Sequence, residues 1–121
     1  MFSTYEIEKV MTSDGNIYYL QYASFTKKEV MEESVKKLDY YLIKESDNKY
    51  YVYVGATTIL ENANLLKKIY EENGIYTYIK NDYFDNSDIM NKIKKIDKEI
   101  IHEEDDNIIM EKNKEILELL K

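Results

Sequence analysis

An internal repeat with a spacing of 32 residues is the feature that most constrains how this chain folds. It relates Tyr18, Tyr19, Thr26 and Glu29 of the first half to Tyr50, Tyr51, Thr58 and Glu61 of the second. A Thr followed three positions later by a Glu is typical of a helix start, because both side chains can satisfy free backbone N–H groups there. Each half therefore predicts a tyrosine-rich strand followed by a helix.

Alternating apolar residues and turn-forming residues extend this pattern to a βαββαβ order. We expect strands over residues 17–22, 40–45, 49–54 and 75–80, and helices over 26–38 and 58–73. The triplet Ser46-Asp47-Asn48 predicts a hairpin between the second and third strands, and Gly74 predicts a left-handed end to the second helix. Short connections with right-handed crossovers then build a four-stranded antiparallel sheet with two helices on one face. This is a ferredoxin-like or RNP-like α+β sandwich.

The chain divides into three parts by pattern. Its 121 residues suit one domain plus an appendage. We expect a leader or linker over residues 1–16, the domain over 17–83 and a helical extension over 84–121. The extension contains isoleucines at helical spacing, namely Ile89, Ile93, Ile96, Ile100, Ile109 and Ile116. Such stripes need a partner, which could be the rest of the chain, each other or a second copy.

Composition argues against several classes of function. A formal charge of −7 and the absence of Arg disfavour phosphate and nucleic-acid binding. The chain has no Gly-rich phosphate loop and no Cys, and its single histidine, His102, lies in an acidic stretch far from the strands. We therefore expect no enzyme activity, no metal and no cofactor.

The face of the sheet without helices is predicted to collect tyrosines. Strand side chains alternate between faces, so the aliphatic residues that face the helices leave a second set on the open face. This set contains Tyr19, Gln21, Tyr51, Tyr53, Tyr76 and Tyr78. An aromatic platform with amide and hydroxyl groups suits a glycan or unstacked RNA bases. Only Lys49 lies near the third strand, which favours a neutral glycan over RNA.

Two short stretches resemble the SPOR (sporulation-related repeat) domain family. Residues 20–25, Leu-Gln-Tyr-Ala-Ser-Phe, are similar to its opening Val-Gln-x-Gly-Ser-Phe, and residues 51–55, Tyr-Val-Tyr-Val-Gly, to its third strand, Tyr/Arg-Val-x-Val-Gly. Ala63, Leu66, Tyr70 and Gly74 fall at the spacing of its second helix and closing glycine. The resemblance covers residues 17–83, and the basic residue often found on the third strand of the family is absent.

This resemblance implies a βαββαβ module that binds peptidoglycan glycan strands stripped of stem peptides. Gln21 and Ser24 match positions that line the glycan site in such domains, and Tyr51 and Tyr53 match sheet-face positions. A location at the cell envelope is implied as well, in a division- or sporulation-related protein. That location is usually reached through an N-terminal anchor, which here would require a segment upstream of Met1.

Two other functions remain open on the sequence. The isoleucine stripes suggest a protein-interaction or assembly module acting through the C-terminal helices or the open sheet face. RNA binding is a further alternative, because the sheet topology and the aromatic platform are compatible with it.

Overall fold

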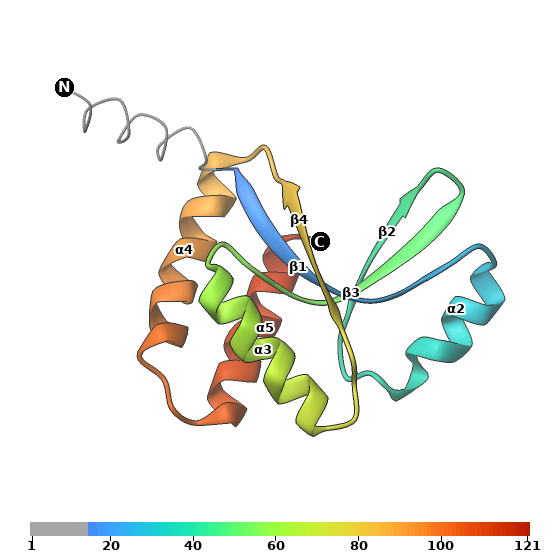
Figure 1. Cartoon of the computed structure of the whole chain (residues 1–121). Coiled ribbons are helices and arrows are strands. Elements are labelled where there is room, and N and C mark those ends of the chain that lie inside the picture. The colour runs from blue at the N-terminus through green and yellow to red at the C-terminus, as the bar shows by residue number, and fades with distance from the viewer. Residues whose placement is uncertain (1–14) are drawn as a thin grey trace.

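The computed structural model describes residues 15–121, which form four strands and five helical segments (Figure 1). In chain order these are β1 (Asn16–Phe25), α2 (Lys28–Ser34), the 3-10 helix η1 (Val35–Lys37), β2 (Leu42–Ser46), β3 (Lys49–Thr57), α3 (Leu60–Glu72), β4 (Tyr78–Tyr83), α4 (Ser87–Ile101) and α5 (Asp106–Leu119). The leader predicted over residues 1–16 lies almost wholly outside the described residues. Within residues 15–121, no helix combines the length and apolar character that crossing a membrane requires.

The four strands form one antiparallel sheet in the order β2-β3-β1-β4. This order puts β1 and β3 in the centre of the sheet and β2 and β4 at its edges. It confirms the predicted ferredoxin-like topology. The hairpin between β2 and β3 turns at Asp47 and Asn48, whose φ angles are 52° and 62°. Two successive positive φ values make the tight turn that matches the right-handed twist of paired strands.

All four strands differ from their predicted bounds: β2 begins two residues later than predicted, and β3 ends three residues later. β1 continues to Phe25, because its second half pairs with the start of β3. β4 begins at Tyr78 and ends at Tyr83, three residues later at each end than predicted, so that Tyr76 lies outside the strand. The cause is the register with β1, which opposes Tyr78 to Gln21 and Tyr83 to Asn16. Local alternation cannot supply such a long-range pairing.

Both predicted capping boxes are wrong. The residues that precede α2 and α3 are Lys27 and Ile59, and neither makes a side-chain cap hydrogen bond. The left-handed end of α3 is confirmed, since Gly74 has a φ of 80°.

The carboxylate of Asp97 in α4 takes the place of the second capping box. It accepts hydrogen bonds from the Thr57 hydroxyl at 2.6 Å, the Thr58 backbone N–H at 2.8 Å and the Thr58 hydroxyl at 2.5 Å. Asp97 is 0% exposed. The side-chain amide of Asn62 also donates to the Asp97 backbone carbonyl at 3.1 Å. Asp97 therefore holds α4 against the junction between β3 and α3, and Thr58 faces α4 instead of capping its own helix.

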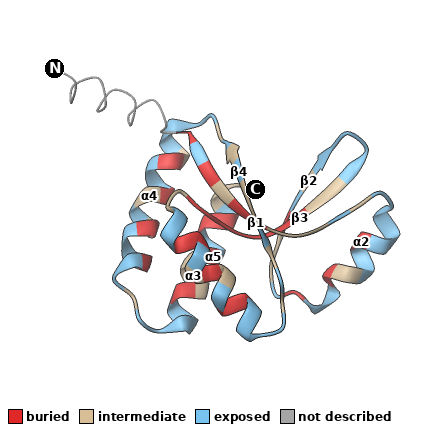
Figure 2. Ribbon diagram, viewed as in Figure 1, coloured by how far each residue is buried: buried red, intermediate tan, exposed pale blue. Residues whose placement is uncertain are grey.

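The C-terminal helices pack onto the same chain. Figure 1 shows α3, α4 and α5 grouped beside one end of the sheet, while the β2–β3 hairpin projects away from them. Ile93, Ile100, Ile109 and Ile116 are all buried, and Figure 2 shows buried residues concentrated where these helices meet the sheet. The isoleucine stripes therefore belong to the core of this chain.

α5 covers a free edge of β3. Pairing with β2 ends at Tyr53, so the next residues of β3 have no neighbouring strand on that side. The carboxamide of Asn113 fills this place, because its Nδ2 donates to the Val54 carbonyl at 2.9 Å and its Oδ1 accepts from the Ala56 N–H at 3.3 Å. These two bonds reproduce what a partner strand would give. All three residues are buried.

Two tyrosine hydroxyls complete the network around Asn113. Tyr70 of α3 donates to the Val54 carbonyl at 2.8 Å, and Tyr40 donates to the Met110 carbonyl of α5 at 2.9 Å. Asn113 Nδ2 also lies 3.0 Å from the Tyr40 hydroxyl and 3.4 Å from the Tyr70 hydroxyl. Burial raises the pKa of both phenols, so they stay protonated donors.

We expect Asn113→Ala to lower the free energy of unfolding by about 2–3 kcal/mol, because it leaves the buried Ala56 N–H without a partner. Lys114→Ala, an exposed neighbour on the same helix, is the matched control and should change it by less than about 0.5 kcal/mol. Urea unfolding followed by circular dichroism measures both. Equal stability of the two variants would show that Asn113 does not secure the edge of β3.

Candidate functional site

The strand register places six of the seven predicted site residues on one face of the sheet. Residues directly opposed in antiparallel strands share a face, and their side chains are neighbours. One row across the sheet contains Tyr53, Gln21 and Tyr78, and the next row contains Tyr51 and Ser24. Tyr19 lies on the same face, two residues before Gln21. We call this surface the tyrosine face. Tyr76 precedes β4 and is not part of it.

A bulge in β1 brings Gln21 and Ser24 to the same face. The two residues are three positions apart, so simple alternation would send their side chains to opposite sides. The register shifts between Gln21 and Ala23, leaving Tyr22 as an extra residue. The Tyr22 ring lies 5.4 Å from the ammonium of Lys37 in η1. The bulge thus gives the tyrosine face both an amide and a hydroxyl from β1.

Burial divides the tyrosines into two groups. Tyr19 and Tyr53 stack with ring centroids 4.4 Å apart and are only 0% and 1% exposed. The expectation that they form part of an exposed platform is wrong, because neighbouring side chains cover them. Tyr51 is partly buried, whereas Tyr76 and Tyr78 are 71% and 66% exposed. Gln21 is partly buried and Ser24 is exposed.

Two lysines that the sequence analysis missed lie over these rings. The ammonium of Lys80 is 4.5 Å from the Tyr51 ring centroid and donates to the Tyr53 hydroxyl at 3.4 Å. The ammonium of Lys44 lies 5.2 Å from the Tyr19 ring centroid. Cations at such distances are attracted to the ring face. Alternation in the strand predicted over residues 75–80 already put Lys80 on the same face as Tyr78, so the sequence contained this signal. The opposition of Lys44 to Tyr51 needed the β2–β3 register.

Both lysines and two of the tyrosines, Tyr51 and Tyr53, line a hollow at the hairpin end of the tyrosine face. Its volume is about 390 Å³, and it is lined by Lys44, Glu45, Ser46, Asp47, Tyr51, Tyr53, Lys80 and Asp82. That volume lies in the range of small-ligand sites. No residue of α4 or α5 lines it, so the C-terminal helices leave this part of the sheet accessible.

The hydroxyl of Tyr19 is buried close to this hollow. It has no hydrogen-bond partner within residues 15–121. Burial raises the pKa of Tyr19 to about 12, and the nearby charges of Asp82 and Tyr53 add to the increase. The phenol therefore stays neutral at physiological pH, and together with Tyr53 it forms an apolar base beneath Lys44.

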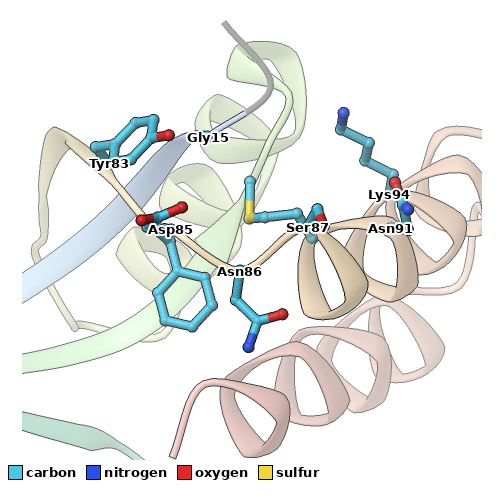
Figure 3. Close-up of a pocket in the computed structure, with 9 residues that line it drawn as sticks. Gly15, Tyr83, Asp85, Asn86, Ser87, Asn91 and Lys94 are labelled. Atoms are coloured by element: carbon cyan, nitrogen blue, oxygen red, sulfur yellow. The ribbon is translucent and has the colours of Figure 1, made fainter.

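A second hollow at the junction of β4 and α4 is too small for a sugar. Figure 3 shows Tyr83 and Asp85 on one side of it and Asn91 and Lys94 of α4 on the other. Its volume is only about 80 Å³. Elsewhere in residues 15–121, no three acidic or histidine side chains form a group that could hold a metal ion. His102 is exposed at the end of α4.

Comparisons with known proteins give one similar structure. No protein-family model matches the chain, and no curated protein matches it. The fold is similar to the solution structure of the peptidoglycan binding domain of the B. subtilis cell wall lytic enzyme CwlC. The two chains are 20% identical with a TM-score of 0.47, and the match covers 55% of this chain and 90% of that one.

Replacing Tyr19 by Phe tests the burial of its hydroxyl. An unfolded tyrosine ionises near pH 10 and folded Tyr19 near pH 12, so stability should fall as the pH rises between these values. Tyr19→Phe should reduce this fall and cost nothing at pH 7, because the lost hydroxyl has no partner. Urea unfolding at pH 7, 10 and 11 measures both effects.

The control for this test is Tyr70→Phe, which removes a buried hydroxyl that donates a hydrogen bond. It should lower the free energy of unfolding at pH 7 by about 1–2 kcal/mol. A loss of that size for Tyr19→Phe as well would mean that the Tyr19 hydroxyl has a partner.

Proposed function

We propose that this chain is a non-catalytic module that binds peptidoglycan glycan strands lacking stem peptides. The hollow beside Tyr51 is the observation that carries the proposal. It joins the partly buried ring of Tyr51 to hydroxyl, carboxylate and ammonium groups, and the C-terminal helices do not cover it. Sugars present apolar ring faces edged by hydroxyls, so an aromatic ring within a polar rim is chemically suited to them.

Gln21, Ser24 and Tyr78 extend this proposed site across the sheet. Gln21 stands between Tyr53 and Tyr78 in one row, and Ser24 stands beside Tyr51 in the next. A strand of several sugars could therefore lie across β3, β1 and β4, with Tyr51 and Tyr78 stacking on rings and Gln21 bonding to an acetamide group. Tyr19 and Tyr53 support this surface from below, and Tyr76 lies beyond its edge.

The proposed ligand places the protein at the cell envelope, outside the cytoplasmic membrane. The resemblance of residues 20–25 and 51–55 to SPOR domains supports this location and a division- or sporulation-related role. Both remain part of the proposal.

A pull-down on insoluble glycan strands treated to remove stem peptides tests the function. The full chain should be captured, and the double variant Gln21→Ala, Tyr51→Ala should bind about tenfold more weakly or worse, because it loses the ring and the amide together. Tyr83→Ala is the matched control, since this exposed tyrosine lies on the opposite side of β4 from Tyr78 and Lys80. Undiminished capture of the double variant would disprove the site, and no capture of the unmodified chain would disprove the function.

The isoleucine stripes that suggested an assembly module do not support it in the structure. Four of the six stripe isoleucines are buried and the other two, Ile89 and Ile96, pack partly buried against the same core, so the stripes need no second protein. We expect the full chain to sediment as a monomer at micromolar concentration. A concentration-dependent dimer in analytical ultracentrifugation would favour the assembly module instead.

A further inference from the structure

Lys44 and Lys80 share one hollow, and neither pairs with a carboxylate in the part of the chain that the structure describes. Lysines elsewhere in that part do form such pairs, as Lys36 does with Glu33 at 3.0 Å and Lys112 with Glu99 at 2.9 Å.

Tyrosines hold both ammonium groups in place. Lys80 contacts the ring of Tyr51 and the hydroxyl of Tyr53, which uses one of its three N–H donors. Lys44 lies over the ring of Tyr19. Attraction to a ring face orients an ammonium group but leaves most of its hydrogen-bond donors unused. Both lysines are partly buried, so a bound anion would be shielded from water and salt more than at an open surface.

The charges around the hollow limit which anion could bind. Glu45 and Asp47 lie at the hairpin and Asp82 lies two residues after Lys80, so three acidic side chains line the hollow beside the two lysines. A ligand with a phosphate on every unit would be repelled by this arrangement. A ligand with an isolated carboxylate and many hydroxyls is compatible with it, because hydroxyls can donate to the acidic groups while the carboxylate accepts from the ammonium groups.

We propose that Lys44 and Lys80 recognise the free carboxylate of an acidic amino sugar. This inference rests on the proposed function and makes it more specific, because removing the stem peptide from a peptidoglycan strand leaves one carboxylate on every muramic acid unit. The lysines then bind peptide-free strands in preference to intact strands because only peptide-free strands carry this charge. In an intact strand this carboxylate is consumed in an amide bond and offers the lysines no charge.

Isothermal titration calorimetry on the full chain with three soluble ligands of equal length tests the inference. These are a peptide-free strand with free muramic carboxylates, the same strand with each carboxylate converted to its methylamide, and an oligomer of N-acetylglucosamine. The unmodified chain should bind the acidic strand about tenfold more tightly than the methylamide strand or the N-acetylglucosamine oligomer.

Lys80→Gln identifies the residue responsible. It should weaken binding of the acidic strand about tenfold and remove most of the preference for the acidic strand over the methylamide strand. Lys68→Gln, an exposed lysine on α3, should change neither affinity. Thermal unfolding of each variant verifies that it is folded, and the comparison of ligands on the unmodified chain needs no variant at all.

The possible failures are distinguishable. Equal affinity of the unmodified chain for the acidic and methylamide strands would overturn the carboxylate inference while leaving glycan binding intact. Binding to none of the three sugars would overturn both proposals. A single-stranded oligonucleotide that binds more tightly than the acidic strand would show that the lysines recognise phosphate, and would overturn the inference as well.

Discussion

The structure depends on how the free edge of β3 is satisfied. β3 has nine residues but β2 covers only its first five, so the backbone groups of Val54 and Ala56 face an interior without a partner strand. Buried backbone groups without hydrogen bonds are costly, and Asn113 supplies both missing bonds from a helix. The sheet therefore needs the C-terminal helices to satisfy the backbone groups at this edge of β3. These helices close one end of the sheet, while the hairpin end remains free.

This arrangement explains the position of the candidate site. Because α3, α4 and α5 gather beside one end of the sheet, the hollow forms at the other end, where the hairpin extends beyond them (Figure 1). The rings of Tyr19 and Tyr53 are stacked and buried beside the hollow, and they contact Lys44 and Lys80. Tyrosine therefore has two roles on one face: Tyr19, Tyr51 and Tyr53 order the lysines, and Tyr51 and Tyr78 also keep exposed ring surface that a ligand could contact.

The repeat and the strand alternation predicted much of this. Tyr19, Gln21, Tyr51, Tyr53 and Tyr78 could be assigned to one face because alternation is a local property of each strand. The second capping box failed because Thr58 has a stronger competitor in Asp97, which lies 39 residues away in the sequence. Lys80 falls on the same side of the predicted strand as Tyr78, but its contacts with Tyr51 and Tyr53 depend on the order of the strands in the sheet.

The sequence by itself determined the βαββαβ order, the antiparallel sheet and the common face of the tyrosines, because periodicity and turn chemistry act over a few neighbouring residues. Only the tertiary structure decided which tyrosines are buried, that Lys44 and Lys80 stand above them and that α5 completes the edge of β3. Asn113 and Val54 are 59 residues apart, and nothing near either residue predicts their contact. Such contacts arise because the folded chain must satisfy every buried polar group at once, which is a property of the whole arrangement.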